Sequence, residues 1–155
     1  MSIKNYHGLA ESASPLIVIG GTHRMPALRW CRDIVLDGAS LTVPALRAVY
    51  GTVILYPGSW LSGDIETAEV IDVIDGELDL PALREVQDLY VQGGKVRLHQ
   101  LRRVTGDLVI GANAVLVASN LTFAGRITVR PGGKFTSISR GLYEIETAAT
   151  AALKR

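Results

Sequence analysis

The amino-acid sequence predicts an all-β protein, a right-handed parallel β-solenoid of about seven coils of roughly 18 residues each. The first observation is the phrase Pro-Ala-Leu-Arg, which begins at 26, 44 and 81 and returns as His-Gln-Leu-Arg at 99. Neighbouring copies lie 18 residues apart, and the longer interval of 37 residues spans about two periods. The second observation is that apolar residues alternate over three or four positions, which is the period of a strand, between Gly, Asp, Asn and Pro. The third is that no window of 12 or more residues within 16–141 shows a clean helical period.

The coils follow one another in order along the chain. A leading unit fills 16–33, the double interval predicts a diverged unit between 52 and 72, and two weaker units follow at 107–125 and 126–141. A unit this short cannot bury its own apolar side. Stacked copies can, because strands of successive coils then pair about 4.8 Å apart and equivalent residues form columns.

The two ends of the solenoid need covers, because an unpaired sheet edge invites pairing with another chain. We therefore expect an N-terminal cap at 1–15, the solenoid at 16–141, and a C-terminal cap at 142–155. The last segment is rich in Ala and Glu and ends in Lys-Arg, which favours a short helix, with a frayed tail as the alternative. The third unit is about three residues longer than its neighbours, and we expect the extra residues at 57–63 to form a protruding loop.

One stretch in the middle of the chain has a regular leucine pattern, formed by Leu80, Leu83, Val86, Leu89 and Val91. The pattern resembles the leucine-rich β-helices of receptor L domains and their bacterial relatives, over roughly residues 16–130. That resemblance implies a right-handed β-helix. A conventional leucine-rich repeat fits less well, because its unit is longer and carries an Asn or Cys column.

A left-handed hexapeptide helix also has 18 residues per coil, but it requires an aliphatic residue at every sixth position. The series from Val35 reaches Leu41 and then Arg47, so the third side of the coil lacks the required aliphatic residue. A further resemblance concerns the Gly-rich segments at 61–80 and 123–135, which are similar to the coils of bactofilins. Those bacterial cytoskeletal proteins polymerise end to end, so this resemblance implies self-assembly.

Composition and charge narrow the classes of partner. The chain has 48% hydrophobic and 20% charged residues and a formal net charge of +1, which indicates a globular protein without general attraction to nucleic acid or membrane. The single cysteine excludes an internal disulfide. The start of the chain lacks an apolar signal segment, and the longest apolar runs, such as 16–19, are too short to cross a bilayer. We expect a soluble, cytoplasmic protein.

The residue types that carry chemistry do not form a catalytic or metal-binding constellation. Cys31 aligns with valines of three other copies, so we expect it to pack in the core. His23 aligns with apolar residues of later copies, and His99 replaces a corner proline. Their spacing does not match a metal site, and corner aspartates usually bind nearby backbone amides. We therefore predict no catalytic residue, no metal and no cofactor.

Arginine and tryptophan are the candidate partner-binding residues. Trp30 occupies an outward repeat position, and Trp60 lies in the expected loop; exposed tryptophans tend to anchor interfaces. Four arginines share one repeat position and would form a ladder along one edge: Arg29, Arg47, Arg84 and Arg102. The alternative for the ladder is that each arginine is simply solvated, with its stem covering apolar surface.

Three functions fit these features. The first is a non-enzymatic module that presents a flat solenoid face to a protein partner, for example as an inhibitor of host machinery. The second is a self-assembling, bactofilin-like structural protein. The third is a small solenoid enzyme acting on carbohydrate or acyl groups, for which His99, Asp72 and Asp75 are the available residues.

Overall fold

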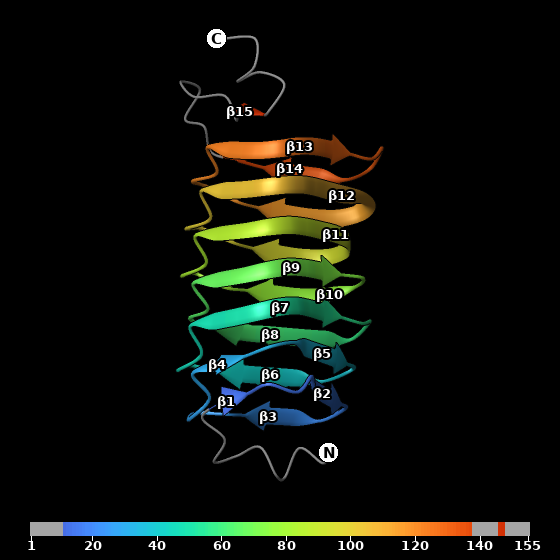
Figure 1. The fold of residues 1–155 in the computed structure, drawn as a ribbon. Coiled ribbons are helices and arrows are strands. Elements are labelled where there is room, and N and C mark those ends of the chain that lie inside the picture. The colour runs from blue at the N-terminus through green and yellow to red at the C-terminus, as the bar shows by residue number, and fades with distance from the viewer. Residues whose placement is uncertain (1–10, 138–145, 148–155) are drawn as a thin grey trace.

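The structure, a computed structural model, describes residues 11–137 and 146–147. These residues form one parallel sheet of fifteen strands that winds through about seven coils, and the described part of the chain contains no helix. Figure 1 shows the coils piled on one another, with β1 to β3 at one end and β13 to β15 at the other. The prediction of an all-β parallel solenoid is confirmed.

Each coil contributes strand segments to three stacks, which we call the first, second and third stack. The first stack contains β1 (Glu11–Ser12), β4 (Trp30–Cys31), β15 (Glu146–Thr147) and the start of five longer strands: β7 (Ala48–Leu55), β9 (Thr67–Val73), β11 (Glu85–Arg97), β12 (Arg103–Val117) and β13 (Phe123–Val129). The second stack contains β2 (Leu16–Ile19), β5 (Ile34–Asp37) and the following part of the same five strands. The third stack contains β3 (Thr22–Arg24), β6 (Ser40–Val43), β8 (Ser59–Gly63), β10 (Gly76–Asp79), the ends of β11 and β12, and β14 (Lys134–Thr136).

The repeated phrase forms the turn that leads from the third stack back to the first. In the second copy the Leu46 amide donates to the Val43 carbonyl at 3.3 Å, which closes a turn with Pro44 at its second position. Proline is favoured there because its ring fixes the φ angle that the turn requires. The copies at Leu83 and Leu101 close in the same way, at 3.3 and 3.2 Å. The phrase therefore recurs because one turn recurs.

The core runs along the axis of the solenoid as columns of aliphatic side chains. The leucines of the repeated phrase are fully buried, and Ile65 takes the equivalent place in the diverged unit between Leu46 and Leu83. Cys31 also lies in the core, in register with Val49, as its alignment predicts. Because each inward residue packs on its equivalents in the next coils, the sequence repeat becomes a continuous hydrophobic interior.

The prediction of a protruding loop at 57–63 is wrong. Ser59–Gly63 is strand β8, which pairs with both β6 and β10, so Trp60 lies within the sheet. Register places Ala48 beside Thr67, an interval of 19 residues, and Thr67 beside Glu85, an interval of 18. The third coil is thus longer than its neighbours by one residue rather than three. It has one extra residue at each of two corners, and the turn before Ile65 is one residue shorter.

Three coils carry an extra residue between the first and second stacks. In the first coil three residues lie between Ser12 and Leu16, whereas two lie between Cys31 and Ile34 in the second. The pairings shift register between Val49 and Thr52 and again between Val104 and Asp107, and these intervals contain Gly51 and Gly106. A side chain at Gly106 would overlap the Asp88 carboxylate of the coil below, which explains the glycine.

The predicted caps lie mostly outside the described residues. Within the predicted N-terminal cap, Glu11–Ser12 forms β1 and pairs with β4. Within the predicted C-terminal helix or tail, only Glu146–Thr147 is described, and it forms β15, which pairs with β13.

Candidate binding surfaces

The second stack presents an apolar outer side. Along its strands, fully buried residues such as Leu16 and Val18 alternate with outward residues such as Ile17 and Ile19, whose exposed fractions are 50% and 76%. The side chains that share these two outward columns and are apolar form the surface that we call the apolar face: Ile17, Ile19, Val35, Ile54, Tyr56, Ile74, Tyr90 and Val109.

The apolar face exists because these strands are apolar at consecutive positions. In a strand, neighbouring side chains point to opposite sides, so an uninterrupted apolar run places half of its residues outside. Such runs are typical of strands that are covered on both sides. Here Tyr56 is 40% exposed. Polar residues interrupt this outer side at Asp37, which lies beside Ile19, and at Asp72, which accepts a hydrogen bond from Gln92 Nε2 at 2.8 Å. Toward the last coils it becomes polar, with Gln92, Thr128 and Arg130 exposed.

Sequence reasoning missed this surface. It assigned partner binding to tryptophan and arginine, and it considered the apolar run at 16–19 only to show that the run is too short to cross a membrane. The available signal was that this run and its equivalents in the next coils, at 34–36 and 53–56, are apolar throughout rather than alternating.

Trp30 lies on the outer side of the first stack, as predicted. Its ring meets the ring of Tyr50 edge to face, with centroids 5.7 Å apart and an interplanar angle of 67°. Ala48, which is in register with Trp30, is too small to cover the indole. Tyr50 is 65% exposed, so the pair forms an accessible aromatic patch two residues before Thr52, where the second stack of that coil begins.

Trp60 lies on a different stack from Trp30. It is half-buried in β8, in register with Ser40 and Glu77, and it lines a shallow groove together with Glu77 and Lys95. The structure therefore does not bring the two predicted aromatic residues together.

The arginines do form a ladder along the turn between the third and first stacks, but the ladder is interrupted. The Arg47 amide donates to the Arg29 carbonyl and the Arg102 amide to the Arg84 carbonyl, both at 2.9 Å. Between the two pairs the chain inserts Glu66, which bonds Arg47 on one side and Arg84 on the other through its backbone. The result is two exposed cationic pairs separated by an exposed carboxylate.

The residues considered for catalysis lie apart. His99 is exposed, with Nδ1 3.2 Å from Ser119 Oγ, whereas Asp72 lies on the second stack and pairs with Gln92. His23 is half-buried in the first coil, and its Nε2 lies 2.9 Å from the Gly20 carbonyl oxygen. Across residues 11–137, no group of three or more His, Cys, Asp or Glu side chains is placed to hold a metal ion.

No helix long and apolar enough to cross a membrane occurs in the described part of the chain. No protein-family model, no curated protein and no solved structure matches this chain.

Proposed function

We propose that the protein is a non-enzymatic binding module that docks a protein partner on its apolar face. The observation that carries the proposal is the exposure of Ile17 and Ile19 on an outer side that has at least one apolar outward side chain in each of the first six coils. Contiguous exposed apolar surface of this kind marks interaction sites in soluble proteins. Seven coils at about 4.8 Å make a surface roughly 34 Å long, enough to contact a partner domain.

The aromatic patch of Trp30 and Tyr50 supports the same proposal. It lies beyond the first corner, next to the apolar face, and aromatic side chains supply much of the energy at protein interfaces. Arg29 and Arg47 lie on the turn before Trp30 and Ala48 and would form a polar rim.

Site-specific photo-crosslinking in the source cells tests the docking surface. A photoreactive phenylalanine analogue replaces Ile17 on the apolar face or Thr22, an exposed residue of the same coil on the third stack. We expect a discrete protein adduct from position 17 and none from position 22. The adduct should disappear when Ile19→Glu is added and persist when Arg24→Glu is added. Equal adducts from both positions, or none from position 17, would refute the docking surface.

A second candidate function is self-assembly through the C-terminal edge of the solenoid. Among the described residues, β15 pairs only with Phe123 and Ala124, so the stretch 126–129 of β13 has no strand on its outer edge. Val129 ends an inward column and is nevertheless 44% exposed. An uncovered edge of this kind can accept a strand of another copy.

Electron microscopy of the purified chain at micromolar concentration tests this candidate. Filaments that Val129→Lys abolishes, and that Thr128→Lys on the outward side of the same strand preserves, would establish edge-to-edge assembly. A monodisperse preparation of the unaltered chain would refute it.

A further inference from the structure

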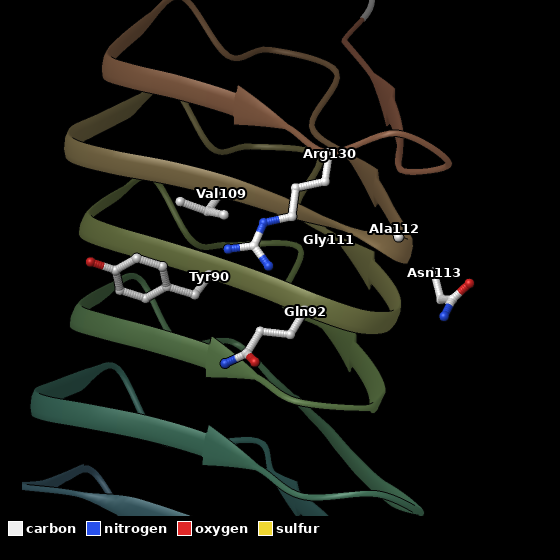
Figure 2. A pocket seen from close by; sticks show the side chains of 7 residues that line it. All are labelled: Tyr90, Gln92, Val109, Gly111, Ala112, Asn113 and Arg130. Atoms are coloured by element: carbon white, nitrogen blue, oxygen red, sulfur yellow. The ribbon is translucent and has the colours of Figure 1, made fainter.

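A groove of about 500 Å³ opens at the end of the second stack, where the fifth, sixth and seventh coils meet; these coils begin at Glu85, Arg103 and Phe123. Gln92, Gly111 and Arg130, from three successive coils, border it. Gly111 is buried, and a Cβ there would overlap the Gln92 backbone carbonyl, so the long side chains of Gln92 and Arg130 border the groove with no side chain between them (Figure 2). The corner of the sixth coil is also one residue longer than that of the fifth, because Ile110 to Asn113 faces Val91 to Gly93.

The polar groups that line the groove are of different kinds. Arg130 is exposed, and none of the described carboxylates lies within 4.0 Å of its guanidinium as an ion-pair partner. Gln92 donates its amide hydrogen to Asp72 at 2.8 Å, which fixes the amide and leaves its Oε1 as an acceptor. Asn113 also lines the groove, but its amide is directed away from Arg130 and Gln92 (Figure 2). One cation and one amide oxygen suit a ligand that carries both a carboxylate and hydroxyl groups.

The apolar part of the lining is the Tyr90 ring with Val109 in register beside it. Figure 2 shows the Arg130 guanidinium reaching down toward Tyr90 and Gln92, while the Tyr90 hydroxyl points away from it. Burial and the carboxylates of Asp88, Asp107 and Asp72 raise the pKa of the Tyr90 phenol, so negative charge surrounds that end. The groove thus has a cation at one end and carboxylates near the other, which would orient an acidic ligand.

We propose that this groove binds one hexuronate unit, an acidic six-membered sugar ring. The sugar carboxylate pairs with Arg130, one of its hydroxyls donates to Gln92 Oε1, and the apolar side of its ring lies on Tyr90 and Val109. A guanidinium binds a carboxylate through two parallel hydrogen bonds, and an aromatic ring packs well on the C–H side of a sugar. The groove shares Tyr90 and Val109 with the apolar face, but sugar binding by the purified chain can be measured whether or not a protein partner docks there.

Nuclear magnetic resonance titration of the ¹⁵N-labelled chain tests the proposal, with glucuronate as the probe and the amides of Gly111, Ala112 and Asn113 as reporters. We expect saturable shifts at these amides, with binding at least about tenfold tighter than for glucose, which lacks the carboxylate, and for acetate, which lacks the ring. No saturable shift at tens of millimolar glucuronate would overturn the proposal, as would equal affinity for acetate.

Two variants separate the site from general charge. Arg130→Gln should weaken glucuronate binding about tenfold, which corresponds to one charge-assisted hydrogen-bonded pair. Arg126→Gln removes an exposed arginine of β13, the strand that ends just before Arg130, outside the groove and should leave binding unchanged. Equal losses in the two variants would overturn the assignment to Arg130.

A hexuronate can arrive as a free monosaccharide or within an acidic polysaccharide, and a hexuronate tetramer distinguishes these sources. Tighter binding of the tetramer supports the site and assigns a chain as its ligand. Equal affinity supports the site and assigns the free sugar, whereas binding of the tetramer without shifts at Gly111 to Asn113 would contradict it.

Discussion

The carboxylate of Asp88 accepts a hydrogen bond from the backbone amide of Asp107, one coil later, at 2.8 Å. Asp33 and Thr52 repeat the relationship at the same distance near the other end of the solenoid. In both cases the amide follows the extra glycine of a longer coil. The aspartate of the shorter coil therefore bonds the backbone where the two coils differ in length.

Asp88→Ala should lower the free energy of unfolding by about 2 kcal/mol, because it leaves a partly buried amide without its charged acceptor. Urea denaturation of the variant measures this loss. Asp37→Ala is the matched control, because Asp37 is exposed and its carboxylate bonds none of the described residues. A loss in Asp88→Ala no larger than in the control would contradict the role of this bond.

Ser59→Ala should be neutral or should raise the free energy of unfolding by up to about 1 kcal/mol. The Ser59 side chain is 2% exposed, and its hydroxyl has no hydrogen-bond partner among the described residues. Register places Ser59 beside Gly76, and Ala39 and Gly94 occupy equivalent positions, so a methyl group fits the column. Thermal denaturation measures the change, and a clear drop in melting temperature would contradict it.

The thiol of Cys31 should make stability fall at alkaline pH. Burial, with a contribution from Asp33, raises the pKa of this thiol from 9.0 to about 12. Between these values the unfolded chain releases the proton and the folded chain keeps it, so each pH unit lowers the free energy of unfolding by about 1.4 kcal/mol. At a pH well below 9.0 the thiol is protonated in both states and has no effect on the pH dependence.

Cys31→Val isolates this contribution, because valine occupies the same column at Val49 and all other groups titrate alike. Urea denaturation of both proteins at about pH 8 and about pH 10.5 should show a steeper loss in the cysteine protein. Parallel losses would mean that the thiol is accessible in the folded state.

Trp30→Ala and Trp60→Ala should have different effects on partner binding, because the two indoles lie on different stacks. A partner on the apolar face that reaches around the first corner contacts the aromatic patch, so Trp30→Ala should weaken binding about tenfold. Trp60→Ala should leave affinity unchanged, and both variants should stay folded. Affinity measured with the crosslinked partner, once identified, decides this, and the reverse order of effects would contradict it.

The fold could be predicted from the sequence because the solenoid repeats one turn. Pro44 and Leu46 have local roles, a fixed φ angle and an inward side chain, that recur with the phrase. The position of Trp60 could not be predicted, because the third coil redistributes single residues among its corners and only the register of β8 reveals where they lie. The apolar face was missed because an outward isoleucine and an inward isoleucine look alike in an uninterrupted run.

The match in length between adjacent coils has a consequence for the number of coils that this molecule needs. The third coil has one more residue than the fourth at each of its two corners, and the fourth and fifth coils have the same length throughout. The fifth coil would therefore pair with the third as the fourth does now. Removing residues 67–84 joins Glu66 to Glu85 and preserves every mismatch between adjacent coils. The number of coils is therefore not fixed by the fold, and a chain shortened by this one coil should fold with the same first and last coils.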